Sequence, residues 1–527
     1  MNQFITKLAG QVEGVIHGFD RLVFRGTLRR LCYPNGMEWY LYQNHVLHKD
    51  YGKHVEAISQ RVRKAAEESM RAVGRTVLYL KSCRTDKNEV ARKIAAEQKI
   101  DSGPVCALSC VEPIQSFRMK KNEKGKLEPV VDRRQGLVVY HYSIHREFGW
   151  MNARIQTWFP MPIQICLNGR EWLARQMDRE GLHYQRHDNC FSWLENYERA
   201  QKLAHEQLKV NWPRLLDEIA EDLSPLHEEI FRHYETEYYW GCEQSEWATD
   251  LVLNNPGKFE RMYPQLIRHS MVNLSCTDVM RFLGRKIKPE GVVPERFTGE
   301  VGSNLKRRRE GIRVKFEMNG NLVKAYDKAK TDRVVVLRAA ETTINHPDGF
   351  QSYRTKQGDA EGEQQWRPMR KGIADLYRRA EVSQACNDRF LNALAAVDNS
   401  HTVQEITSEI QQPVKWKQRR VRALRPWAED RALLEAIHNG KFSLNGFRNR
   451  DLQSVLFPAA TGGKPEARRR TGKVSRHLRM LRAHGLIQKV PNTHRYQITD
   501  KGRSISVAVL TASSTTVETL NRLSTAA

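Results

Sequence analysis

The stretch VEGVIHGFDRLVFRGTLRRL, residues 12–31, has the alternating pattern of a β-strand and carries one acid in its middle. The alternation puts Asp20 on the same face as Leu22 and Phe24. A carboxylate among apolar groups is unfavourable unless it is compensated. Three outcomes are open: Asp20 pairs with a nearby arginine such as Arg25, lies at the exposed end of the strand, or helps to hold a metal ion.

The position of this acid is similar to that in metal-dependent nucleases and transposases of the ribonuclease H-like fold, which carry an acid in the middle of the first strand. The similarity is one of placement only. It implies that Asp20 is a ligand of a catalytic metal ion.

Two more candidate acids follow in the N-terminal part. RTVLYLKS, KNEVARKIAAEQK and PVCALSCVEPIQSFRM predict a strand, a helix and a strand, which indicates an α/β or α+β layer. Glu112 ends the second strand, where open sheets usually place ligand groups, and a salt bridge is its alternative role. Glu147 lies two residues after His145. The spacing of His141 and His145 is H-x3-H, which differs from the H-x-H of rolling-circle nucleases.

A third segment combines polar and aromatic residues along one predicted strand. In ARIQTWF the alternation puts Arg154, Gln156 and Trp158 on one face. Such residues suit phosphate contact, hydrogen bonding to a base edge and base stacking, respectively. The alternative is a face that a neighbouring helix covers.

A hairpin is predicted at residues 311–345, because the Asn-Gly turn at Asn319 lies between two alternating segments. Its Tyr-Asp-Lys strand, followed by Arg338 and Glu341, weakly resembles plasmid and phage replication initiators, which carry a tyrosine, a lysine and an arginine-x-glutamate near the DNA. Here the spacing is Arg-x-x-Glu, which puts the two residues on opposite faces of a regular strand unless a bulge intervenes.

The composition limits the class of partner. The chain has 527 residues, 86 Lys or Arg, 61 Asp or Glu and a net charge of +25. Such an excess favours a polyanion, with nucleic acid ahead of an acidic membrane surface. We expect DNA, with RNA as a further possibility, and leave the oligomeric state open. The sequence lacks a signal peptide and a membrane-spanning run, so we expect a cytoplasmic protein without a membrane partner.

Several common chemistries lack their signatures. The nine cysteines include no C-x-x-C pair, so we expect neither disulfides nor a zinc site. The sequence also has no P-loop, no dinucleotide fingerprint and no Gly-x-Ser-x-Gly elbow. The cofactor is therefore open, with Mg²⁺ as the choice if the acids are catalytic.

Positive charge concentrates near the C-terminus, where residues 413–503 contain 22 Lys or Arg against six Asp or Glu. A helix at 432–440 and a second helix precede ARRRTGKVSRHLRMLRAHG, in which Val474, Leu478 and Leu481 recur at helical spacing. LIQKV, a PNT turn and HRYQIT then predict a β-hairpin.

This order of elements over the last 90 or so residues resembles bacterial winged-helix domains of the MarR and ArsR type. The resemblance implies that Arg476, Arg479 and Arg482 meet the major groove and its phosphates, and that Asn492, His494 and Arg495 lie on the wing. The alternative is a protein-docking module with solvated arginines.

We interpret the remaining basic runs as nucleic-acid contacts. The complete expected set is Arg154, Gln156, Trp158, Lys306, Arg307, Arg308, Arg309, Lys415, Arg419, Arg420, Arg468, Arg469, Arg470, Lys473, Arg476, His477, Arg479, Arg482, Asn492, His494 and Arg495.

The predicted fold class is a multidomain α+β protein. We expect a mixed α/β sheet domain at 1–196, a helical region at 197–290, a β-hairpin region with a basic run at 291–360, a helical linker region at 361–425 and a winged helix at 426–527.

Two functions remain open. The first is a sequence- or structure-selective nucleic-acid-binding protein, as in a mobile element or replicon. The second is a Mg²⁺-dependent nuclease, strand-transferase or replication initiator that draws its ligands from Asp20, Glu112, Glu147 and Glu341. The second requires at least two of these acids to lie within a few ångströms of one another, and it fails if they lie apart or if each is paired with an arginine.

Overall fold

A computed structural model describes residues 2–8, 10–285, 299–308, 311–356, 359, 361–395, 402–438, 442, 446–458, 463–490 and 493–516. The chain divides into two compact units. The sheet unit comprises Gly10–Pro256 and Ala325–Asn387, and the second unit comprises Met1–Ala9, Gly257–Lys324 and Asp388–Ala527.

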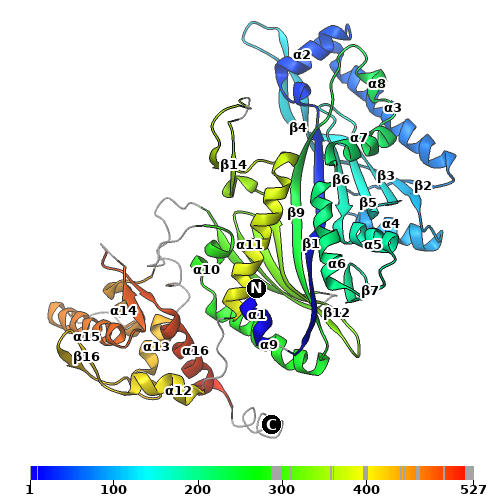
Figure 1. Ribbon diagram of the computed structural model, residues 1–527. Helices are drawn as coiled ribbons and strands as arrows, with labels where there is room; N and C mark the ends of the chain where they lie inside the picture. The colour runs from blue at the N-terminus through cyan, green and yellow to red at the C-terminus, as the bar shows by residue number, and fades with distance from the viewer. Residues whose placement is uncertain are drawn as a thin grey trace. The chain divides into compact units, whose positions relative to one another are not determined.

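A large β-sheet forms the centre of the sheet unit (Figure 1). The nine strands of this sheet that lie wholly or partly in the sheet unit follow the order β12-β13-β9-β1-β6-β5-β4-β3-β2. Their bounds are β1 (Val12–Thr27), β2 (Thr76–Tyr79), β3 (Gly103–Lys121), β4 (Leu127–His145), β5 (Gly149–Gln156), β6 (Ile163–Asn168), β9 (Tyr239–Leu253), β12 (Asn321–Lys330) and β13 (Val335–Ile344). Strand β2 pairs with β3 in parallel, whereas β1 pairs antiparallel with both β6 and β9, and β9 pairs antiparallel with β13.

Helices and two small hairpins complete this unit. The helices are α2 (Pro34–Gln43), α3 (Tyr51–Ala72), α4 (Lys87–Glu97), α5 (Gly169–Glu180), α6 (Tyr197–Glu206), α7 (Trp212–Leu223), α8 (His227–Ile230) and α11 (Leu376–Ala395), whose last residues belong to the second unit. The hairpins are β7 (Tyr184–His187) with β8 (Cys190–Leu194), and β14 (Gln351–Arg354) with β15 (Gln365–Pro368).

The main hydrophobic core lies between the central strands and their helices. Helices α5 and α6 pack along β1, and their apolar residues, such as Leu173 and Leu203, join Phe19 and Trp247 in one buried cluster (Figure 1). Half of the residues of β1 are buried, most of them between Ile16 and Phe24.

Strand β9 differs from the expectation that residues 197–290 are helical. This strand, YWGCEQSEWATDLVL, pairs with β1 on one side and with β13 on the other, and β13 lies in the expected hairpin region. Pairing between strands far apart in sequence, which helical and strand periodicity cannot reveal, thus unites segments that the sequence predicts to lie in separate domains. The predicted turn is present, because Asn319 and Gly320 both have positive φ between β11 (Gly311–Met318) and β12.

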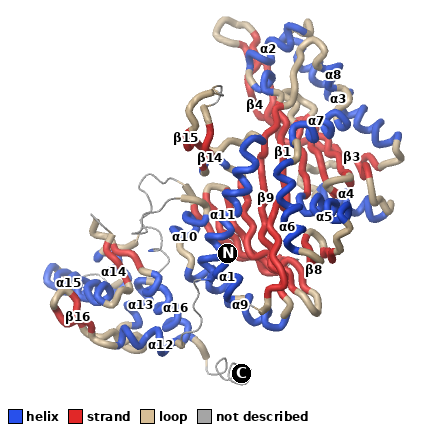
Figure 2. Tube along the Cα trace, in the orientation of Figure 1, coloured by secondary structure: helices blue, strands red, loops and turns tan. Residues whose placement is uncertain are grey.

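The second unit contains α1 (Asn2–Lys7), α9 (Pro256–Asn273), α10 (Cys276–Phe282), β10 (Val301–Arg308) and β11. Its residues 402–516 form what we call the C-terminal module (Figure 2). In chain order the module has α12 (Val403–Ser408), the hairpin β16 (Val414–Trp416) and β17 (Arg419–Val421), α13 (Arg431–Ile437), α14 (Asn449–Leu456), α15 (Lys464–Ala483), the hairpin β18 (Ile487–Lys489) and β19 (Tyr496–Ile498), and α16 (Asp500–Ser514).

The module has its own hydrophobic core. Val474, Leu478 and Leu481 of α15 pack with apolar residues of α13, α14 and α16. The structure thus contains the expected order of helices followed by a hairpin, and the chain is a mixture of helices with a large mixed sheet. Across the described residues, no helix combines the length and the apolar composition needed to cross a bilayer.

Burial of His141 in β4 predicts acid sensitivity of the sheet unit. Neither ring nitrogen of His141 has a hydrogen-bond partner among the described residues, and burial lowers the pKa of this imidazole to about 4. The lowered pKa means that the folded state favours the neutral imidazole. The contribution of neutral His141 to the stability of the folded protein is therefore complete above the unfolded pKa of about 6.5, and it is lost as the pH falls toward 4. Between pH 7.5 and pH 5 we expect the titration of His141 to lower the free energy of unfolding by about 2 kcal/mol.

The comparison of wild type with His141→Leu isolates this effect. Denaturant unfolding at the two pH values should show a smaller loss of stability in the variant, by about 2 kcal/mol. His17, whose pKa burial also lowers to about 4, titrates in both proteins and cancels. Equal losses in both proteins would contradict the assignment.

Candidate functional site

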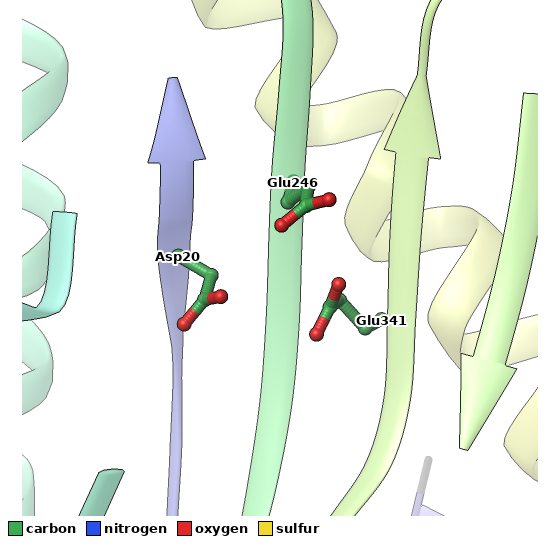
Figure 3. Close-up of side chains that lie close together, drawn as sticks. All are labelled: Asp20, Glu246 and Glu341. Carbon is green, nitrogen blue, oxygen red and sulfur yellow. The ribbon is translucent and has the colours of Figure 1, made fainter. Parts of the chain in front are cut away.

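Three carboxylates from neighbouring strands meet at the centre of the sheet unit (Figure 3). Asp20 lies on β1, Glu246 on β9 and Glu341 on β13. When one carboxylate oxygen is taken from each residue, the three oxygens all lie within 4.8 Å of one another. The residues are 8%, 7% and 1% exposed, respectively, so the group is buried but reaches the surface at Asp20 and Glu246. We call these three residues the acidic cluster.

Two β-bulges on either side of β9 accompany this convergence. The register of β1 against β9 shifts between Phe19 and Arg21, which makes Asp20 the extra residue. The register of β13 against β9 shifts between Arg338 and Ala340. This second bulge is the irregularity that Arg-x-x-Glu required, and it lets Arg338 and Glu341 contact each other. Bulges re-aim side chains in this way and occur often beside functional sites.

Arg338 links the carboxylates and is fully buried. Its Nη1 lies 2.9 Å from Oδ1 of Asp20 and 3.0 Å from Oε2 of Glu341. Its Nε and Nη2 donate to the two carboxylate oxygens of Asp250, at 2.7 and 3.1 Å. One guanidinium therefore joins acids of β1, β9 and β13.

Asp250 connects this group to helix α5. Nη2 of the buried Arg170 donates to Oδ2 of Asp250 at 3.0 Å. Burial by itself would raise the pKa of Asp250, but Arg338 and Arg170 hold it below its usual value. Conversely, burial would lower the pKa of Arg338, and the surrounding acids, led by Asp20, raise it well above the usual value.

Two neutral groups donate to the same carboxylate oxygens that Arg338 contacts. The Tyr326 hydroxyl donates to Oε2 of Glu341 at 2.8 Å and accepts from Nη1 of Arg338 at 3.2 Å. Burial raises the pKa of Tyr326 well above its usual value, so this residue is a neutral phenol. Asn189, between β7 and β8, donates from Nδ2 to Oδ1 of Asp20 at 2.7 Å.

The acidic cluster has the ligand chemistry of a hard divalent cation. Carboxylate oxygens are the protein ligands of Mg²⁺, Mn²⁺ and Ca²⁺. Three like charges at this separation repel one another, and a cation lowers that repulsion. Here Arg338 supplies positive charge to Asp20 and Glu341, and Nη2 of Arg21 lies 2.8 Å from Oε1 of Glu246.

The structure does not bring together the four acids that the sequence suggested. Glu112 on β3 accepts hydrogen bonds from Tyr140 and lies 3.1 Å from Nζ of Lys87 and 3.2 Å from Nη2 of Arg154. Burial would raise the pKa of Glu112, but Tyr140 and Lys87 lower it. Glu147 pairs with Arg179. Asp20 and Glu341 meet the distance condition, yet each of the four acids is paired with an arginine, so the four-acid hypothesis fails in that form.

Glu246 is the functional candidate that the sequence reasoning missed. Its signal is the alternation in SEWATDLV, which puts Glu246 and Asp250 on one side of a strand and Trp247 and Thr249 on the other. The amide Nδ2 of Asn387, on α11, donates to the backbone oxygen of Trp247 and to the hydroxyl of Thr249. Helix α11 therefore lies against the side of β9 opposite Glu246.

The face expected from Arg154, Gln156 and Trp158 is not an exposed reading surface. Arg154 is engaged by Glu112, and the buried amide of Gln156 donates to the backbone oxygens of Gln115 and Trp158. The guanidinium of Arg134 lies 5.3 Å from the Trp158 ring centroid. Strand β5 ends at Gln156, so the predicted alternation does not extend to Trp158, and neighbouring strands and side chains occupy the hydrogen-bonding groups of Arg154 and Gln156.

Most of the C-terminal basic residues are at the surface. Lys415, Arg419 and Arg420 on the first hairpin, Arg468, Arg469, Lys473, Arg476 and Arg479 on α15, and His494 near β19 are exposed. Arg470, His477, Arg482 and Arg495 are half-buried, and Arg470 pairs with Glu466. Lys306 and Arg307 are exposed on β10, whereas Arg309, Asn492 and the side chain of Arg308 lie outside the described residues.

No protein-family model, no curated protein and no solved structure matches this chain.

Arg338→Gln should destabilise the protein by about 3–5 kcal/mol, because it leaves buried carboxylates without their common cation. Arg21→Gln is the matched control, since Arg21 contacts one acid of the cluster and its side chain is 45% exposed; its cost should stay below about 1 kcal/mol. Denaturant unfolding measures both. Equal, small effects would show that Arg338 is not the centre of the network.

Proposed function

We propose that this chain is a cytoplasmic nucleic-acid-binding protein whose C-terminal module works as a winged helix. The observation that carries the proposal is the division of α15 into two sides. One side buries Val474, Leu478 and Leu481 in the core of the module, and the other leaves five basic residues in solvent: Arg468, Arg469, Lys473, Arg476 and Arg479.

Local packing supports this role. The contacts of α15 with α14 and β18 fix the helix from its apolar side, so its basic side chains project from a rigid support. A helix of this kind fits the major groove of B-form DNA, and arginine suits both phosphates and guanine edges. The hairpin β18–β19 follows α15 in the position of a wing, with the exposed His494 ahead of its second strand.

The proposal predicts DNA binding with a steep salt dependence. The triple variant Arg468→Gln/Arg469→Gln/Arg476→Gln should bind duplex DNA much more weakly. Its plot of log K against log salt concentration should be shallower by up to about 0.9 for each phosphate that no longer has a cationic partner. Fluorescence anisotropy over a salt series measures both quantities.

A charge-matched control separates site-specific contacts from bulk charge. Lys64, Lys93 and Lys202 are exposed lysines of the sheet unit, each in an i,i+4 pair with a glutamate. Their triple change to Gln removes the same number of charges. If this control weakens binding as much as the α15 variant does, α15 is not the contact surface.

The acidic cluster favours a second candidate function, metal-dependent phosphoryl transfer on the bound nucleic acid. Asp20, Glu246 and Glu341 would hold the cation, which supplies charge stabilisation to the attacking and leaving oxygens of a phosphodiester. Each of the three acids is paired with an arginine, so the cation would share Asp20 and Glu341 with Arg338, and Glu246 with Arg21. The convergence of three acids from three adjacent strands supports this candidate.

Metal binding by the cluster is measurable without activity. Mg²⁺ or Mn²⁺ should raise the unfolding temperature of the wild type, by the equivalent of about 2.7 kcal/mol at a hundredfold excess over Kd. Glu246→Gln should abolish this shift. Glu147→Gln, which changes an acid outside the cluster, should keep it.

Incubation of labelled DNA with Mg²⁺ then tests the chemistry. Cleavage or joining that disappears in Glu246→Gln would establish the enzyme. The absence of both a thermal shift and a product would leave the cluster a structural ion network.

A further inference from the structure

A groove of about 520 Å³ in the C-terminal module lies where four of its segments meet. The hairpin β16–β17 contributes Trp416, the start of α14 contributes Arg448 and Arg450, the second half of α15 contributes Arg479 and Arg482, and the segment around β19 contributes His494 and Tyr496. Its volume lies within the range of about 300–1,000 Å³ that small ligands occupy in proteins.

Backbone pairing holds two walls of the groove together. Phe447 and Tyr496 exchange hydrogen bonds, at 2.9 Å from the Phe447 nitrogen and 2.8 Å from the Tyr496 nitrogen. Gly446 precedes this bridge with φ +61°, and a Cβ added there would lie 2.2 Å from the Tyr496 carbonyl oxygen. A glycine is therefore required, and Arg448 is fixed beside Tyr496.

The groove is lined by cations and aromatic rings. Five basic side chains line it, and its described lining contains no carboxylate. The Nε of Arg448 is buried and has no hydrogen-bond partner among the described residues. The guanidinium of Arg482 lies 5.1 Å from the ring centroid of Trp416, at cation–π distance. Such a lining suits a phosphate next to a planar base.

Helix α15 therefore presents two different surfaces. Arg468, Arg469 and Lys473, in its first half, are exposed and do not line the groove. Arg479 and Arg482, in its second half, line the concave groove. The major groove of a duplex admits a projecting helix, whereas the bases of an intact duplex are stacked and cannot enter a pocket.

We propose that the groove binds a nucleotide whose base is unpaired, at a strand end, overhang or loop, beside the duplex that the first half of α15 holds. This inference rests on the proposed nucleic-acid binding and specifies its substrate class. The arginines contact the phosphate, and Trp416 and Tyr496 provide the apolar surface for the base. The protein thereby prefers a junction between duplex and single strand over a continuous duplex.

The test compares two probes with the full-length protein. One is a flush-ended hairpin duplex, and the other is the same duplex with a short single-stranded overhang. Anisotropy should show about tenfold tighter binding of the overhang probe, as expected from stacking of one base. The overhang is made once in DNA and once in RNA; a preference for either supports the inference and identifies the sugar recognised.

Variants assign the preference to the groove. The double variant Arg479→Gln/His494→Gln changes two exposed lining residues, so the fold is retained, and it should lose the preference for the overhang. Arg482→Gln, which removes the cation beside Trp416, should act in the same direction. Arg431→Gln changes an exposed residue at the start of α13 that neither lines the groove nor belongs to the expected nucleic-acid contacts, so this variant should keep the preference.

The experiment distinguishes a failure of this inference from a failure of the proposed function. Binding of both probes with equal affinity would overturn this inference and leave the proposed function intact. A preference that survives both groove variants would also overturn it. If neither probe binds, the proposed function fails and this inference fails with it.

Discussion

The guanidinium of Arg338 is the interaction on which the centre of the sheet depends. Acids from three strands, Asp20, Asp250 and Glu341, lie within hydrogen-bonding distance of it. Taking any of these carboxylates out of water is unfavourable unless a cation and hydrogen bonds compensate it. Because one side chain compensates all three, the relative positions of β1, β9 and β13 are coupled.

The coupling explains why irregular backbone is tolerated at this place. Each bulge leaves a residue of the ladder unpaired, and such a defect is retained where the surroundings determine it. The bulges lie at Asp20 and next to Arg338, the residues that the ion network joins. The same arrangement serves both hypotheses for the cluster, since an ion network and a cation site need convergent, oriented carboxylates. A metal ion would share its ligands with Arg338.

The two units carry different electrostatics. In the sheet unit, acids and arginines are buried together at the acidic cluster and around Asp250. In the C-terminal module, the helix α15 is fixed from its apolar side and its positive charge is left to solvent. Buried charge in the first case demands internal partners, and exposed charge in the second attracts external ones. This contrast is the physical basis for the proposal that nucleic acid is held by the module.

The sequence by itself determined the local features. The helical spacing of Val474, Leu478 and Leu481 identified the buried side of α15, and the Asn-Gly pair at Asn319 identified a hairpin turn. Only the tertiary structure decided which acids meet. Arg21 and Glu246, on paired strands, are 225 residues apart in sequence, and bulges altered the strand alternation at Asp20 and Arg338. Periodicity reports which side of its own strand a residue faces, whereas a site made from several strands depends on pairing and register, which long-range packing sets.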